Sequence, residues 1–503
     1  MIAHHKAYVE LLDRFKHIAL LESIEEVLTW DSRTYLPNCA SEYRADQIAL
    51  LTGMAHEKRT DPRIAQLLNE LDADSINTED ISVEAVNLRE WKRDYDKQVK
   101  LPKQLVEEKA CTAVKAQSTW VEARKTNNFG AFKPWLKKTL DLNHQTAECL
   151  GYENELYDAL LDLYEPGVLT CDVAPVLSQL RNELVPLIQS IAGSSKKPDI
   201  SILERETSKS AQRNFASEVA AAIGFDFNQG RLDETAHPFC IGLGLNDTRI
   251  TTRFNENYLP GALFGVIHEA GHGIYDQNLP KEHYGTPMGQ YVSLGIHESQ
   301  SRMWENMVGR SRSFWEYWYP KACEYFPVLK TVTLDDFYFA INEVKPSLIR
   351  VEADEVTYNM HILIRFELER AMLNGDLSAA DLPGAWKEKY RKYLGIDVPN
   401  DTKGCLQDIH WSGGMIGYFP TYSLGNLNAA QLFRKAGEEL GDLDDMFQAG
   451  DFSTLKNWLT EQIHSQGRRY RSGKLIEVVT HEPLSAEPLI DYLKTKYMPL
   501  YGL

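Results

Sequence analysis

The sequence predicts a mostly helical protein that folds as one large unit over residues 1–503. Apolar residues recur at helical spacing through most of the chain, which is typical of helices that bury one face. Only residues 239–253 combine β-branched residues, glycines and an Asn-Asp turn signal in the manner of a β-hairpin. No long linker, low-complexity tract or internal repeat interrupts this pattern. We therefore expect a single unit with one small hairpin or sheet.

The composition argues against several classes of partner. Hydrophobic residues make up 43% and charged residues 25% of the chain, which is typical of a soluble globular protein. A formal net charge of −18 argues against a nucleic-acid partner. No window approaches the roughly 18 charge-free apolar residues of a membrane span, and no apolar stretch of a signal peptide begins the sequence. The seven cysteines are scattered and lack C-x-x-C spacing, so we expect reduced thiols and a cytoplasmic protein.

The helices expected on either side of the hairpin present apolar stripes that indicate core and no function. The clearest stripe ends at the polar residues 193–198 and consists of Leu177, Leu180, Leu184, Leu187 and Ile191. Residues 404–426 break the helical pattern, because five glycines and a proline stand there among aromatic residues. Irregular segments of this kind often carry functional sites.

Residues 263–276 contain H-E-x-x-H, and the spacing has a specific chemical meaning. On a helix, His268 and His272 lie one above the other on the same face, so both imidazoles can aim at one metal ion. Glu269 lies about 100° round the helix, close enough to act on a water at the metal without being a ligand. The pattern predicts a metal site of the hydrolytic type.

A metal site that keeps one position open for water needs a third protein ligand. The extended pattern H-E-x-x-H-x-x-G-x-x-H is excluded, because positions 275 and 278 are neither Gly nor His. Glu298, on a later predicted helix, is our choice, since it shares a face with apolar residues where an unpaired carboxylate is unexpected. His297 and Glu305 are the rival ligands. Alternatively, Glu298 forms only an ion pair with Arg302 one turn on.

The motif His268-Glu269-Ala-Gly-His272, followed by His297-Glu298-Ser, resembles the M32 family of metallocarboxypeptidases, and the resemblance runs essentially from end to end. Further motifs of that family occur in the same order: His237-Pro-Phe, Asp247-Thr-Arg249-Ile-Thr251, Ile349-Arg350-Val-Glu-Ala-Asp354, and Gln407-Asp408-Ile-His410-Trp411. The resemblance implies an almost all-α, two-lobed body, split by a deep groove with zinc at its floor and the small sheet beside the zinc helix. It also implies a homodimer that acts on peptide substrates.

The resemblance gives the site residues their expected roles. Zinc, with cobalt as an alternative, would be held by His268, His272 and Glu298, and would lower the pKa of its water from 15.7 to about 7. Glu269 would be the general base. His410 and Tyr422 would donate hydrogen bonds to the oxyanion, and Tyr418 is a close rival for the second of these roles.

A carboxypeptidase also needs a cation for the terminal carboxylate of its substrate, and a planar arginine suits that group best. We favour Arg350, with Arg249 as the next candidate. His237 is expected to shape the groove, and Asp354 to orient a ligand histidine. Arg302 occupies the position where related gluzincins carry an acid, so this orienting carboxylate must come from elsewhere.

Two other functions compete with that of a zinc carboxypeptidase of broad specificity. One is a zinc endo-oligopeptidase of similar helical fold, which would lack a clamp for the substrate carboxylate. The other is a catalytically inactive metal-binding or scaffold protein. The intact Glu269 argues against an inactive protein, because a pure binding site needs no general base.

Overall fold

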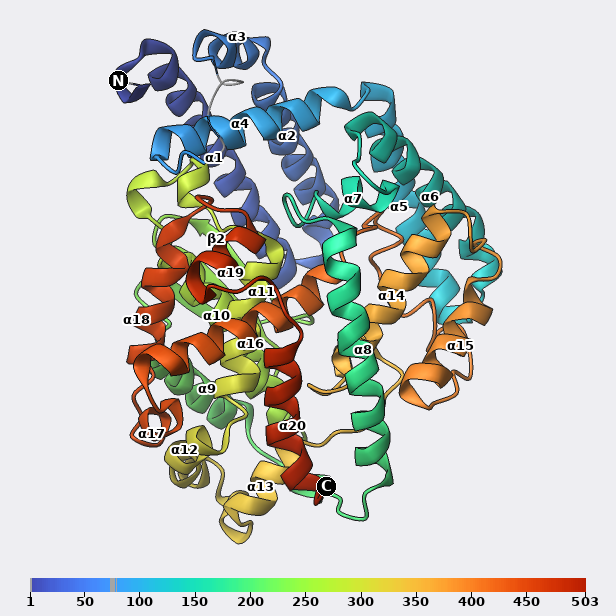
Figure 1. Cartoon of the computed structure of the whole chain (residues 1–503), viewed down its shortest axis with the longest axis vertical. Coiled ribbons are helices and arrows are strands. Elements are labelled where there is room, and N and C mark those ends of the chain that lie inside the picture. Colours follow the sequence, from blue (N-terminus) through green and yellow to red (C-terminus); the bar gives the residue numbers. More distant parts are fainter. Residues whose placement is uncertain (1, 73–76, 78) are drawn as a thin grey trace.

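The computed structural model describes residues 2–72, 77 and 79–503, and helices make up most of it (Figure 1). The expected mostly helical class with one small sheet is confirmed. The helices before the sheet are α1 (Lys6–Thr34), α2 (Ser41–Arg59), α3 (Pro62–Glu70), α4 (Val83–Lys100), α5 (Lys103–Thr126), α6 (Phe129–Leu150), α7 (Leu156–Leu161), α8 (Thr170–Gly193) and α9 (Lys209–Ile223). Those after it are α10 (Leu259–Gln277), α11 (Leu294–Arg302), α12 (Arg312–Tyr325), α13 (Leu334–Ile341), α14 (Tyr358–Leu373), α15 (Leu382–Leu394), α16 (Pro420–Leu440), α17 (Leu443–Gln448), α18 (Ser453–Gln462), α19 (Ser472–Thr480) and α20 (Glu487–Tyr501).

The leucine stripe of residues 177–191 lies on α8, is buried, and ends where the helix ends, as predicted. The prediction for residues 404–426 is only partly right. Turns extend as far as residue 419, but α16 begins at Pro420 and includes Tyr422. Proline can begin a helix because the first turn does not need its missing N–H. Tyr422 is therefore held by a regular helix.

The sheet contains β1 (Gly230–Glu234), β2 (Cys240–Gly244) and β3 (Asp247–Thr252) in the order β1-β3-β2. β2 and β3 form the predicted antiparallel hairpin, and Asn246 takes the positive φ of 61° in the turn between them. β1, which the sequence did not predict, pairs with β3 in parallel. Its sequence, Gly-Arg-Leu-Asp-Glu, carries only one apolar residue. Strand β2 is left at an edge of the sheet.

The buried apolar residues form two clusters. The smaller joins α1, α3 and α4 and contains a stacked pair, Phe15 and Trp91, with ring centroids 4.7 Å apart. The larger runs from Ala116 to Tyr501 and includes much of α10. α10 packs against β3, α9 and α11, and α11 packs in turn against α16. Figure 1 shows α10, α11 and α16 close together, in the half of the molecule below the N-terminal helices. Helix α10 is thus fixed on several sides by the main core.

Across the described residues, no helix combines the length and the apolar character that crossing a membrane requires.

Candidate metal centre and active site

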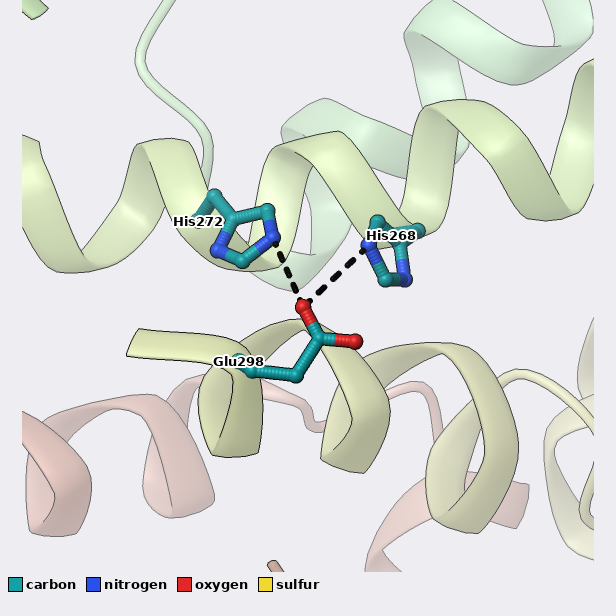
Figure 2. Close-up of side chains that lie close together, drawn as sticks. All are labelled: His268, His272 and Glu298. Carbon is teal, nitrogen blue, oxygen red and sulfur yellow. Dashed lines mark ion pairs between the residues drawn. The ribbon is translucent and has the colours of Figure 1, made fainter. Parts of the chain in front are cut away.

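Helices α10 and α11 bring the three expected ligands to one point. The Nε2 atoms of His268 and His272 lie 3.8 and 3.4 Å from Oε2 of Glu298. Figure 2 shows both rings directed from α10 at the carboxylate below them. One donor atom from each residue lies within 4.8 Å of the other two. Both histidines therefore lie on the same face of α10, as their i, i+4 spacing predicted.

Close approaches of two helix backbones hold α11 in place. A Cβ at Gly271 of α10 would lie 2.6 Å from Cα of Ser301, so only glycine fits there. A Cβ at Gly425 of α16 would lie 2.5 Å from Cγ of Glu298 itself. The side chain of Glu298 is therefore enclosed by α16 on one side while it faces the histidines on the other.

The chemistry of these donors fits a divalent metal ion. Burial lowers the pKa of His272 to about 4, so its ring is neutral near pH 7 and has a lone pair to offer. Glu298 forms the ion pair with Arg302 as well, because Oε1 accepts from Arg302 Nε at 2.7 Å while Oε2 faces the rings. The predicted ion pair with Arg302 is therefore present, and it leaves Oε2 of Glu298 directed at the two rings.

The rival ligands have other partners. Nε2 of His297 contacts Oδ1 of Asp276 at 2.9 Å, and its ring stacks on that of His272 with centroids 4.5 Å apart. Glu305 Oε2 accepts a hydrogen bond from Nδ1 of His268 at 2.9 Å, on the side of the ring away from Glu298. Neither residue joins the group of three, but Glu305 fixes the orientation of one of its members.

A π-helical turn, Met303–Val308, carries Glu305 into that position directly after α11. Turns of this kind occur often at functional sites. The prediction that Asp354 would orient a ligand histidine is wrong. The Asp354 carboxylate accepts hydrogen bonds from the backbone of Val356 and Thr357 instead, and so shapes its own loop before α14.

Glu269 lies on α10 with 7% of its surface exposed. Burial raises the pKa of its carboxyl group to about 7. Among the described residues, none donates a hydrogen bond to this carboxylate. Its oxygens are thus free to accept a proton from a water molecule.

His410, Tyr418 and Tyr422 form an aromatic cluster close to Glu298. Nε2 of His410 lies 3.4 Å from the hydroxyl of Tyr422, and the ring centroids of the two tyrosines are 5.5 Å apart. Burial lowers the pKa of His410 to about 4 and raises the pKa of Tyr422 well above its usual value. At neutral pH His410 is an uncharged imidazole and Tyr422 an intact phenol, so both can donate hydrogen bonds.

Arg350 is 6% exposed and is held from two sides. Its Nε donates to Asp408 Oδ1 at 2.9 Å, and its Nη1 donates to the hydroxyl of Tyr358 at 3.0 Å. Asp408 also accepts from Nε of Arg365 at 2.7 Å. The guanidinium carbon lies 5.0 Å from the ring centroid of Tyr422. Within the described residues, Nη2 of Arg350 has no hydrogen-bond partner, so this nitrogen is available for an anion.

The other two residues expected to bind substrate stand apart from the ligands. Arg249 is paired in a fork with Asp247, with both N–O distances 2.8 Å, and its guanidinium lies 4.1 Å from the ring centroid of Trp30. His237 is exposed between β1 and β2. Neither hydrogen-bonds a proposed metal ligand in the described chain, and their roles stay predictions.

Two cavities are lined by residues that contact or neighbour the metal-centre histidines. One of about 240 Å³ is lined by Arg302, Glu305 and Tyr358, and so lies on the side of His268. Another of about 410 Å³ is lined by Asp276, the partner of His297, together with the edge strand β2. A peptide that crosses the metal centre would have space on either side of it.

Comparison with known proteins decides the family. The model of a family described as carboxypeptidase Taq (M32) metallopeptidase matches residues 10–497. The chain belongs to this M32 family. It is 48% identical to thermostable carboxypeptidase 1 of Thermus thermophilus over 506 residues, covering 99% of each chain. It is 40% identical to carboxypeptidase 1 of Bacillus subtilis over 501 residues, again covering 99% of each.

Solved structures agree with this assignment to the M32 family. An M32 carboxypeptidase from Deinococcus radiodurans R1 superposes with a TM-score of 0.96 at 39% identity, covering 99% of this chain and 100% of that one. A Pyrococcus furiosus carboxypeptidase gives 0.95 at 35% identity, covering 99% and 100%. The family and the helical fold expected from the sequence are confirmed. The chain is a metal-dependent carboxypeptidase.

Proposed function

We propose that this M32 protein is a carboxypeptidase of the gluzincin type whose metal is zinc, held by His268, His272 and Glu298. The observation that carries the proposal is the convergence of two imidazoles and one carboxylate within 4.8 Å. Two His and one Glu are a ligand set of catalytic zinc, which keeps a fourth position open. Cobalt suits the same donors and is the alternative metal.

A zinc ion bound there would supply an acidified water, with its pKa lowered to about 7. Glu269 accepts the proton of that water and passes it to the amine that leaves the cleaved peptide bond. Its position next to His268 and its lack of any other described hydrogen-bond donor support this role.

His410 and Tyr422 donate hydrogen bonds to the oxygen that becomes negative as the carbonyl is attacked. Both side chains are uncharged at pH 7 and carry a hydrogen that they can donate, which supports this role. The 3.4 Å distance between Nε2 of His410 and the hydroxyl of Tyr422 also supports it, because both groups can then reach one oxygen. Tyr418 packs against both rings, and within the described residues no hydrogen bond joins its hydroxyl to His410. We therefore retain Tyr422 as the second donor.

Arg350 binds the terminal carboxylate of the substrate through its available Nη2. Asp408 fixes the guanidinium before substrate arrives, so little side-chain entropy is lost on binding. Tyr358, which accepts from Nη1, also lines the cavity of about 240 Å³. The proposed carboxylate contact thus lies at the edge of a space that can take the last side chain of the peptide.

Replacing Arg350 by Ala is expected to lower kcat/KM on free-acid peptides by at least about tenfold, since a charge-assisted hydrogen bond contributes roughly 1.5–3 kcal/mol. Peptides with an amidated C-terminus cannot use the contact, so they should be poor substrates of both forms. The measurement compares hydrolysis of each free-acid peptide with its amidated twin. Arg249→Ala is the matched control and should change the two rates by the same factor.

An equal loss on free and amidated peptides by Arg350→Ala would assign Arg350 a structural role. Good cleavage of amidated peptides by the unmutated protein would favour an endo-oligopeptidase. Both results are distinguishable from loss of folding, which circular dichroism reports for each variant.

We propose further that the protein acts on peptides in the cytoplasm as a homodimer, without a nucleic-acid or membrane partner. All seven cysteines are free thiols, which supports a reducing compartment. The packed helices α1 and α2 expose two apolar stripes at helical spacing, which support an interface between copies. The stripes are Leu20, Ile24 and Val27 on α1, and Tyr43, Leu50 and Met54 on α2.

Ile24→Glu is expected to convert a dimer to a monomer, because it places a charge in the middle of the α1 stripe. Sedimentation velocity at micromolar concentration measures the change. Val114→Glu, at a position 71% exposed on α5, is the matched control and should remain dimeric. A monomeric unmutated protein would end the dimer proposal and leave the metal centre unaffected.

A further inference from the structure

The turn that follows α7 connects two parts of the active site that are far apart in the sequence. Its residues Tyr164 and Glu165 contact the start of α11, which carries Glu298, and also the segment that precedes α16. Glu165 is completely buried. Neither residue belongs to the proposed ligand set or to the proposed catalytic groups.

The turn accepts two of the hydrogen bonds that the start of α11 donates. The first four N–H groups of a helix have no partner within the helix. In α11, the N–H of Leu294 donates to the carbonyl of Tyr164 at 3.4 Å, and that of Gly295 donates to the carboxylate of Glu165. The N–H of Ile296 donates to the side-chain oxygen of Ser293, and the N–H of His297 makes the first i→i−4 bond of the helix, to the carbonyl of Ser293. The first two donors of the ligand helix therefore depend on the turn.

Gly295 leaves no spare room at this contact. A Cβ at that position would lie 2.8 Å from Oε1 of Glu165, so the carboxylate rests directly on the helix backbone. Burial raises the pKa of this carboxyl group to about 7, while the N–H of Gly295 stabilises its charged form. Glu298 follows Gly295 by three residues, about one helical turn. A displacement of the first turn of α11 would thus move the carboxylate ligand.

The same turn contacts the aromatic cluster from the other side. The ring of Tyr164 packs edge-on against Tyr418 with centroids 5.1 Å apart. Next to it, Gly417 takes a positive φ of 88°, and a Cβ there would lie 2.8 Å from the backbone of Leu160. The backbone before α16 therefore rests on the end of α7, and the turn touches both sides of the active site.

We propose that Tyr164 and Glu165 are positioning residues that set the distance between the ligand Glu298 and the tyrosine cluster of Tyr418 and Tyr422. This inference rests on the proposed metal site. Glu165 acts through Gly295 on the metal ligand, whereas Tyr164 acts through Tyr418 on the oxyanion donors. The two residues should therefore affect different measurable properties.

For Glu165 the test compares a shorter carboxylate side chain with a side chain of the same length that cannot ionise. Glu165→Asp keeps the carboxyl group but is one methylene too short for Gly295, and should weaken metal binding about tenfold or more. Glu165→Gln keeps an acceptor at the same distance, and should stay within about threefold of the unmutated protein. Metal affinity is measured by titrating the metal-free chain with Zn²⁺ against a coloured chelator, and ligand geometry by the visible spectrum of the Co²⁺ form.

For Tyr164 the expected loss lies in turnover. Tyr164→Ala should lower kcat roughly 3- to 10-fold, which corresponds to the usual free-energy contribution of an aromatic pair. Metal affinity should be unchanged. Tyr164→Phe should keep the kcat of the unmutated protein, because the ring and not the hydroxyl makes the contact with Tyr418. If Glu165→Asp fails to fold, Tyr164→Ala and Tyr164→Phe still test the inference through the contact between Tyr164 and Tyr418.

Glu367→Gln is the control, because it removes a partly buried carboxylate far along the chain from the turn. Its carboxylate joins Arg181 of α8 and Lys389 of α15, and its loss should lower stability but leave metal affinity and the cobalt spectrum unchanged. If Glu165→Asp and Tyr164→Ala behave like this control, the turn is merely structural and the inference is overturned. If the unmutated chain binds no metal at all, the proposed function fails instead.

Discussion

Glu269→Gln is expected to lower kcat by about 10²–10⁴-fold, the usual contribution of general acid–base catalysis. Glutamine has nearly the same shape as glutamate, but its amide cannot take a proton from water at neutral pH. The carboxylate has no hydrogen-bond donor among the described residues, so the substitution breaks no structural contact there. Stability should consequently change little.

The decisive comparison is between turnover and metal content of the same preparation. Glu269→Gln should retain one metal ion per chain, because Glu269 is not one of the three converging donors. A variant with full metal and near-normal kcat would remove Glu269 from the mechanism. A variant without metal would show instead that Glu269 contributes to binding the ion.

His272→Ala is expected to abolish stoichiometric metal binding, and with it peptide hydrolysis. Two of three protein donors remain, and catalytic zinc sites use three. Metal analysis after dialysis at neutral pH measures the loss. His297→Ala is the control, because this histidine stacks on His272 but directs its Nε2 at Asp276.

His297→Ala should keep its metal if the ligand set is as proposed. Retention of one zinc per chain by His272→Ala would rule out the proposed ligand set of His268, His272 and Glu298. Loss of metal from both variants to the same extent would make His297 a candidate ligand again.

The sequence predicted those features that follow from local periodicity. The i, i+4 spacing of His268 and His272 requires only that α10 be a helix, and the leucine stripe of residues 177–191 requires only that one face be buried. The turn at Asn246 was predictable because few residues tolerate a positive φ. In each case the residues that carry the signal lie close together in the sequence.

Other features depend on contacts between distant segments and left no local signal. β1 is a strand because it pairs with β3, although its own residues are mostly polar. Glu305 reaches His268 from a π-helical turn, and the hydrophobic periodicity of the sequence does not predict such a turn. Tyr422 lies in a helix because Pro420 can begin one, in a stretch whose glycines suggested a loop.

Arg302 gives the metal centre an internal counter-ion. Its guanidinium contacts both Glu298 and Glu305, at 2.7 and 3.2 Å, and so neutralises much of their charge when no ion is bound. In small zinc domains, by contrast, uncompensated ligands make metal binding and folding a single event. Because Arg302 compensates the two carboxylates, we expect the chain to fold before it binds its metal and metal binding to require no refolding.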